Sequence, residues 1–325
     1  MEMELLQIPE DRGYPTEYLL ARIRGRHAYL LRDWDNIVFS QNPFEYLRTT
    51  RCGELIARYS QEGVWKCQQI EFQWVYYQMN KGLRDIFMPF FICSEIKTLI
   101  ICFRYKIRRG NTAEVEKILP FSLLSGKIKE ALKKDVDLLS VLEEFEEKFS
   151  FHADRLPRLK EIFLKNGLKG VEQTLTDEFL EHTISTGLHP VLKSFFISII
   201  DFKNTITLYK YLRWNIKAEP LFIHGGSIRK SSLKKMIQPH KISEIARLIF
   251  RLTGQRVEEP GRLNIENILL KGLTRQIKIM GRVSPDIGPI LDYLWRCSLE
   301  AQNLSIILYG REVERDVLKE ELVYW

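Results

Sequence analysis

One helical pattern recurs along this chain and constrains its fold more than any other feature. In residues 190–214 the apolar side chains fall in adjacent pairs at every fourth position, which places them on one helix face. Residues 289–310 repeat this arrangement 99 positions later, with Ser298 in place of one apolar residue. Pro190 and Pro289 begin the two segments, at the first helical position, where the missing N–H costs nothing. The pattern predicts two related amphipathic helices.

Each apolar stripe also contains an acidic residue that is followed three positions later by Asn or Thr. A third copy of this pair lies 106 positions before the copy in residues 190–214, inside the apolar stretch 86–103, where Pro89 is expected to break the early turn. The three pairs are Glu95 and Thr98, Asp201 and Asn204, and Glu300 and Asn303. A period of about 100 residues is longer than that of solenoid repeats, so each copy must be a small helical unit with its own core.

The rest of the chain has the same helical character. Residues 15–33 and 127–148 carry apolar side chains at spacings of three or four, whereas strand-like alternation is almost absent. Loop-forming residues are spread thinly and no low-complexity linker interrupts the chain. We therefore expect an all-α protein of three similar units, residues 1–115, 116–217 and 218–325.

The repeated polar pairs allow two interpretations. Residues at i and i+3 project from one side of a helix, so each pair could place a carboxylate in a catalytic site. Alternatively, each pair could satisfy the backbone groups of a neighbouring loop, as buried polar groups must be satisfied. A catalytic site is rarely built three times in one chain, and the repetition therefore favours a structural role for all three pairs.

The cysteines and the N-terminal residues indicate whether the protein resides in a reducing or an oxidising compartment. The five cysteines are Cys52, Cys67, Cys93, Cys102 and Cys297. An odd number without CxxC spacing argues against a disulfide framework and against a zinc site, and Cys93, Cys102 and Cys297 have the apolar neighbours of buried thiols. The acidic start, MEMELLQIPEDRGY, does not resemble a signal peptide. We expect a reducing compartment.

The stretch 86–103 is long and apolar enough to suggest a membrane span. Glu95 and Lys97 lie at its middle, and a charged residue at a bilayer centre costs about 2.5–3.5 kcal/mol on insertion scales. We interpret the stretch as a buried helix, so that any membrane contact runs through another protein.

Two other functions remain open at this stage. Glu178 and His182 are one helical turn apart and could hold a metal for hydrolysis, although no further His or Cys follows at ligand spacing, so an exposed acidic face is favoured. Basic residues cluster around Arg22 to Arg26 and around Arg229 to Lys235, which would suit a scaffold that binds nucleic acid. No recognition motif accompanies them. The net charge of +7 is modest and leaves the partner open.

Glycine-rich motifs give no evidence for catalysis. The sequence His224-Gly-Gly-Ser227 resembles an oxyanion-hole loop, but no GxSxG elbow accompanies it, and no phosphate-binding GxxxxGK[ST] occurs. We expect this glycine pair to open the next helix with Ser227 as its N-cap. The sequence therefore predicts no catalytic residue, no metal and no cofactor.

Several segments in a fixed order carry a resemblance to a known family. They are Tyr18-Leu-Leu-Ala-Arg-Ile-Arg-Gly-Arg26, Asp201-Phe-Lys-Asn204, Phe222-Ile-His-Gly-Gly226, Tyr293 through Glu300-Ala-Gln-Asn303-Leu304, and Glu321-Leu-Val323. Over essentially its whole length the chain resembles the C subunits of archaeal and bacterial V-type (A-type) ATPases, which are homologues of the eukaryotic d subunit. Thr98, His224 and Ser305 depart from residues common in that family.

The resemblance implies a non-catalytic rotor subunit. Members of that family form a funnel of three helical units about a pseudo-threefold axis, with the wide end on the membrane proteolipid ring and a cavity for the central axle. We therefore expect the ring and the axle as partners, no nucleic acid, and a peripheral position on the cytoplasmic face with indirect membrane contact.

Overall fold

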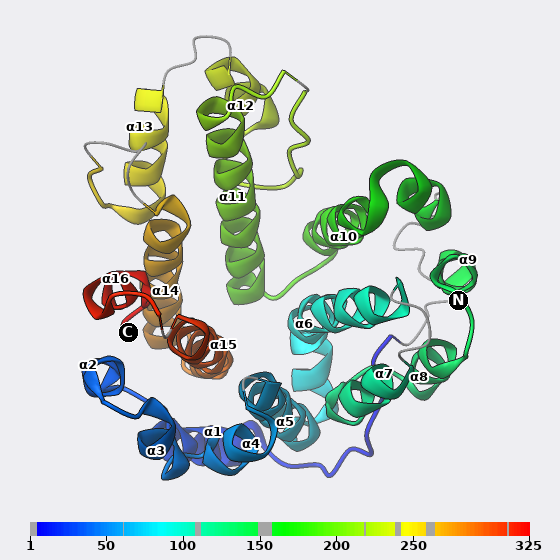
Figure 1. The fold of residues 1–325 in the computed structure, drawn as a ribbon, viewed down its shortest axis with the longest axis vertical. Coiled ribbons are helices and arrows are strands. Elements are labelled where there is room, and N and C mark those ends of the chain that lie inside the picture. Colours follow the sequence, from blue (N-terminus) through cyan, green and yellow to red (C-terminus); the bar gives the residue numbers. More distant parts are fainter. Residues whose placement is uncertain are drawn as a thin grey trace. The chain divides into compact units, whose positions relative to one another are not determined.

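The chain is helical throughout the part that the computed structural model describes. The described residues are 5–60, 62–107, 112–148, 158–217, 219–237, 242–257, 264–310 and 312–325. Within these ranges the β pairing is limited to one isolated antiparallel bridge between Leu6 and Leu124. The prediction of an all-α fold is thus confirmed (Figure 1).

The helices fall into an early, a middle and a late group along the chain. The early helices are α1 (Thr16–His27), α2 (Trp34–Phe39), α3 (Pro43–Arg48), α4 (Gly53–Tyr59) and α5 (Glu62–Gln78). The middle elements are α6 (Lys81–Ile107), α7 (Thr112–Ile118), the 3-10 helix η1 (Leu119–Phe121), α8 (Gly126–Lys133), α9 (Leu138–Lys148) and α10 (Leu159–Ser185). The late helices are α11 (Pro190–Arg213), α12 (Lys230–Ile237), α13 (Ile242–Thr253), α14 (Ile265–Val283), α15 (Gly288–Tyr309) and α16 (Arg315–Glu321).

The chain divides into two compact units, each built from two separate stretches of sequence. The first unit comprises Met1–Tyr14 and Phe72–Leu192, and the second comprises Pro15–Glu71 and Lys193–Trp325. Of the three boundaries, one lies just before α1 and the other two fall within α5 and α11. This division follows how the helices pack, whereas the predicted units follow the repeat in the sequence. The two units therefore do not test the three predicted ones, residues 1–115, 116–217 and 218–325, which stay a prediction.

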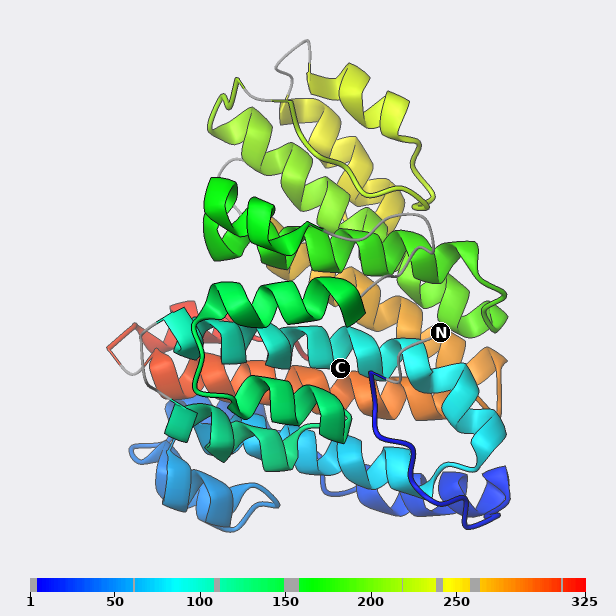
Figure 2. The same cartoon turned by 90° about the vertical axis from the view of Figure 1, so that its right-hand side faces the viewer.

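Helix α6 is the long apolar helix of the first unit. It continues through Pro89, so the expectation that this proline breaks the early turn is wrong. Phe87 and Phe91, on either side of the proline, are fully buried, and this packing offsets the one backbone hydrogen bond that a proline removes. Helix α6 contacts α10, α7 and α9, and Figure 2 shows it nearly lengthwise.

By length and composition, α6 could also cross a bilayer. Its mean hydropathy over the most apolar window is 1.9, and 56% of that window is buried inside the fold. Glu95, near its centre, is 1% exposed and is hydrogen-bonded within the first unit. This burial favours a core helix, because the apolar surface that would face lipid is covered by protein.

Two apolar clusters form the core of the second unit. One joins Trp34 and Ile37 of α2 with Leu304 and Ile307 of α15 and with Leu318 of α16. The other joins the end of α11 with α12, α13 and the start of α14. Helices α14 and α15 lie side by side (Figure 1). The first cluster thus packs helices from near the start of the sequence against the last two helices.

Two predicted helices are shorter in the structure. The segment predicted as one helix over 127–148 is divided into α8 and α9, because the Asp137 carboxylate accepts the Ser140 N–H at 3.0 Å and begins a new helix there. The helix predicted over 15–33 ends at His27, and the N–H of Leu31 donates to the Glu300 carboxylate at 2.8 Å instead of continuing the helix.

Candidate functional site

Asp201 and Asn204, on α11, hold the loop that leads to α12. The Asn204 side chain pairs with the backbone of Ile223: its Nδ2 donates to the carbonyl at 2.9 Å and its Oδ1 accepts the N–H at 2.8 Å. Asp201 accepts the hydroxyl of Ser227 at 2.5 Å, the N–H of Ser227 at 3.1 Å and the N–H of Ile228 at 3.3 Å. Both side chains are almost fully buried, so these contacts satisfy polar groups away from water.

The loop that contains Gly225 and Gly226 brings Ser227 against Asp201. The prediction that Ser227 caps the next helix is wrong, because α12 begins at Lys230 and the Ser227 hydroxyl is bound to Asp201. Gly226 lies so close to Asp201 that a Cβ atom at this position would collide with the carboxylate. Gly225 has a φ of 96°, a conformation that favours glycine. The glycine pair therefore lets the loop approach the carboxylate.

Glu300 and Asn303, on α15, make related contacts with different segments. Asn303 pairs with the backbone of Val323, donating to the carbonyl at 2.9 Å and accepting the N–H at 3.1 Å. Glu300 accepts the N–H of Leu31 at 2.8 Å and also binds Arg51. One turn of α15 thus holds residues from near both ends of the sequence.

Glu95 and Thr98, on α6, form the third predicted pair. Glu95 accepts the N–H of Leu123 and the hydroxyl of Ser122, each at 2.7 Å. Burial raises the pKa of Glu95 above its usual range, although these two hydrogen bonds oppose the shift. Thr98 is completely buried, and it has no amide with which to form the paired contacts of Asn204 and Asn303.

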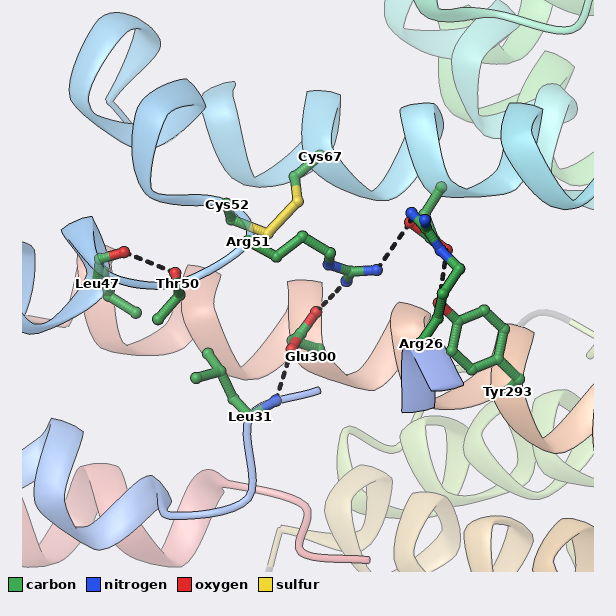
Figure 3. The surroundings of a disulfide bond; sticks show 10 residues. Arg26, Leu31, Leu47, Thr50, Arg51, Cys52, Cys67, Tyr293 and Glu300 are labelled. Carbon is green, nitrogen blue, oxygen red and sulfur yellow. Dashed lines mark hydrogen bonds and ion pairs between the residues drawn. A yellow bond between two sulfur atoms is a disulfide. The ribbon is translucent and has the colours of Figure 1, made fainter. Parts of the chain in front are cut away.

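A buried cluster of charges surrounds Glu300 in the second unit (Figure 3). Arg51 lies between two carboxylates, because it forms ion pairs with both Glu300 and Glu71. Arg26 binds Glu71 through two nitrogens, at 2.6 Å and 2.5 Å, and the Tyr293 hydroxyl donates to Glu71 at 2.5 Å. Glu71 is 2% exposed and Glu300 is 3% exposed. The cluster ties α1, the turn before α4, α5 and α15 together through side chains.

The two carboxylates respond differently to this environment. Burial disfavours the charge of Glu71, but the hydrogen bonds from Arg26 and the charge of Arg51 outweigh burial and lower its pKa. For Glu300, burial is the larger effect and raises the pKa despite Arg51. Burial also raises the pKa of Tyr293, so its hydroxyl stays protonated and can donate to Glu71. Both carboxylates of the cluster are thus satisfied by groups of the protein itself.

A disulfide lies next to this cluster. Cys52 and Cys67 are bonded, with their Cα atoms 5.6 Å apart, and join the start of α4 to α5 (Figure 3). The argument from the sequence against disulfides is therefore wrong for these two cysteines. Cys102 and Cys297 are free and buried, as predicted, whereas Cys93 is half-buried. Burial raises the pKa of the Cys297 thiol to about 12, so this thiol stays neutral.

Sequence reasoning missed Arg51 and Glu71 as partners of Glu300. Glu71 has apolar neighbours in Ile70 and Phe72, but Gln68, Gln69 and Gln73 lie within three residues of it, so it lacks the uniformly apolar surroundings that mark Glu95 on α6. Arg26 was part of a basic cluster, and the structure separates its members: Arg22 and Arg24 are exposed, whereas Arg26 is half-buried against Glu71. The sequence around Glu71 therefore gives little sign of its burial, and its partners cannot be predicted from spacing.

The residues considered for metal binding give no further support to that function. Glu178 and His182 lie one turn apart on α10. Among the described residues no group of three or more His, Cys, Asp or Glu side chains is placed to hold a metal ion. A cavity of about 200 Å³ adjoins Asp201 and is also lined by Ser227, Arg251, Thr253 and Gln276. Both oxygens of Asp201 already accept hydrogen bonds there.

Taken together, the described part of the chain is an all-helical protein whose buried polar side chains bind its own loops and helices. Residues 66–321 match the family model for the ATP synthase (C/AC39) subunit. The chain therefore belongs to the C/AC39 subunit family of V-type and A-type ATPases, and the resemblance found in its sequence is confirmed. No curated protein matches the chain in a direct sequence comparison.

Proposed function

We propose that this chain is a non-catalytic central-stalk subunit in the rotor of a V-type (A-type) ATPase. In this role it couples the central axle to the membrane proteolipid ring during proton or sodium transport. The observation that carries the proposal is the family match, which extends over residues 66–321. The subunit has no active site of its own in this proposal, and its partners are the ring and the axle.

The proposed architecture is a funnel of three helical units about a pseudo-threefold axis. Two of the three predicted polar pairs support the repeat, because Asn204 and Asn303 each bind the backbone of a residue about twenty positions further on. Glu95 and Asp201 likewise each accept a backbone N–H from a later loop, the one before α8 for Glu95 and the one before α12 for Asp201. In this arrangement the three pairs hold the loops of their units and take no part in chemistry.

The proposed location is the cytoplasmic face of the membrane, as a peripheral subunit whose main attachment is the ring. The burial of α6 supports this position, since the one long apolar helix among the described residues is covered by protein over much of its length. Membrane attachment then depends on the complex.

The proposal is tested by capture of partners from native membranes. An affinity-tagged full chain should retain the axle and ring subunits from detergent-solubilised membranes in stoichiometric amounts, and the isolated chain should hydrolyse no ATP. A matched control is the same tagged chain after denaturation in urea, which should retain neither partner. Recovery of neither subunit by the folded chain would overturn the proposal.

A further inference from the structure

One segment of this protein carries a large excess of basic side chains. Residues 202–237 contain eight Lys or Arg side chains and a single acid, Glu219. This excess equals the net charge of the entire chain, +7, so basic and acidic side chains are equal in number over all other residues. A local charge excess of this size indicates a surface that attracts an anionic partner.

The segment folds back on itself in the second unit. Leu212 at the end of α11, Phe222 in the following loop and Leu233 of α12 belong to one apolar cluster. The Lys234 ammonium donates to Glu219 at 2.5 Å, which ties α12 to the loop. The end of α11 and α12 also lie close together in Figure 1. The basic side chains at the end of α11, in the loop and on α12 therefore belong to one compact region, which we name the α11–α12 surface.

Four exposed basic residues of this surface have no counter-ion within the described part of the chain. Lys210 and Lys234 form ion pairs with Glu266 and Glu219. Among the described residues no ion pair involves the other exposed basic side chains, which are Arg213, Lys217, Arg229 and Lys235. A cluster of like charges of this size repels itself in the free protein, and an anionic surface would relieve that repulsion.

Large apolar side chains are exposed among these charges. Trp214 is 61% exposed and Leu221 is 67% exposed, and Ile216 lies between them in the loop with 39% exposure. Tryptophan favours the boundary between water and lipid, where its ring is buried and its N–H stays hydrated. A basic surface with Trp and Leu at its loop has the composition of an interfacial membrane contact.

We propose that the α11–α12 surface binds the anionic headgroups of a lipid bilayer directly, with Trp214 and Leu221 inserted at the interface. This contact is additional to attachment through the ring, and it rests on the proposed function only for its place at a membrane. The aliphatic Leu221 favours a bilayer over nucleic acid, since a leucine offers no aromatic face for stacking on bases.

Vesicle co-sedimentation of the purified full chain tests this proposal. Phosphatidylcholine vesicles that contain phosphatidylglycerol should bind the chain, and vesicles of phosphatidylcholine alone should bind it weakly. Binding should fall steeply as salt is raised, because the attraction is screened. In vesicles with brominated lipids, the tryptophan fluorescence should be quenched, and Trp214→Ala should remove most of that quenching.

Two variants with the same change in net charge distinguish the effect of this surface from the effect of net charge. Replacement of the four residues without a counter-ion by Gln (R213Q, K217Q, R229Q and K235Q) should weaken binding on the order of 100-fold. The control replaces four exposed basic residues elsewhere by Gln (R12Q, R24Q, R48Q and K165Q) and should change binding only a few-fold. Thermal melting should show that both variants fold, since every replaced side chain is exposed.

Three results would overturn the inference: equal binding to both kinds of vesicle, equal weakening by the two quadruple variants, or salt-dependent binding to RNA that outcompetes the vesicles. None of these results would bear on the proposed rotor function, because the vesicles contain no ring or axle. Conversely, failure to capture the ring would leave vesicle binding intact.

Discussion

The polar pairs on α11 and α15 stabilise a buried carboxylate in two different ways. Asn204 and Asn303 make the same paired contact with a loop backbone. Their acidic neighbours differ, because Asp201 is held by neutral donors from its own loop, whereas Glu300 depends on the guanidinium of Arg51. Arg51 in turn serves a second acid, Glu71. A buried carboxylate can thus be stabilised locally by hydrogen bonds or remotely by a shared counter-ion.

The difference predicts where the protein is vulnerable. Around Asp201 each donor contributes a modest share, so the loss of one leaves the others in place. Around Glu300 the counter-ion among the described residues is Arg51, whereas Glu71 is also bound by Arg26. Removal of Arg51 therefore exposes Glu300 to an uncompensated burial cost and weakens the compensation of Glu71.

The largest effect is expected from Arg51→Gln. This change leaves Glu71 and Glu300 buried with less compensation, and loss of one partner from a buried ion pair costs about 3–5 kcal/mol. Urea denaturation should show this loss of unfolding free energy. The control Arg48→Gln, at an exposed position three residues earlier, should change it by less than about 0.5 kcal/mol. Equal stabilities for the two variants would contradict the central place of Arg51.

The disulfide beside Arg51 should make the next largest contribution. The bond closes a loop with a sequence separation of 15 residues, for which chain entropy predicts about 3 kcal/mol. The double variant C52S and C67S should lose about this much unfolding free energy. Alkylation of the denatured, unreduced protein should label three cysteines, and labelling of five would show that the bond is absent.

Asn204→Ala and Asn303→Ala should have nearly equal effects, because the two side chains make the same backbone contacts. Each change leaves a buried N–H and a buried carbonyl unpaired, at a cost of about 2 kcal/mol. Gln302→Ala, next to Asn303 but exposed, is the matched control and should be nearly neutral. Chemical denaturation of the three variants measures this, and a marked difference between the two Asn variants would break the comparison.

The smallest effect is expected from Ser227→Ala. This variant removes one hydroxyl donor from Asp201, while the N–H groups of Ser227 and Ile228 remain. We expect a loss of about 1 kcal/mol in unfolding free energy, against little change for Ser231→Ala at an exposed position of α12. If Ser227→Ala lost as much unfolding free energy as Arg51→Gln, Asp201 would depend on a single partner as strongly as Glu300 does.

The sequence predicts the helices and the buried polar pairs, but not what the pairs contact. Apolar periodicity predicts both ends of α11 and α15 to within one residue. It can do so because the buried side chains of an amphipathic helix recur at spacings of three and four residues. Glu300 binds Leu31 and Arg51, which are more than 240 residues away, and no local pattern encodes such a contact. The bond between Cys52 and Cys67 was not predicted for the same reason, since spacing alone does not show that the start of α4 lies beside α5. The break between α8 and α9 depends on one capping residue, Asp137.

The proposed coupling function is tested most directly by removing and restoring this subunit. Membranes that lack the chain should still hydrolyse ATP without driving ions across the membrane, and addition of the purified wild-type chain should restore ATP-driven ion transport. Measurement of transport and hydrolysis in the same vesicles gives the coupling ratio. A coupling role predicts a ratio near zero without the chain and recovery with it, whereas full ion transport in the absence of the chain would contradict that role.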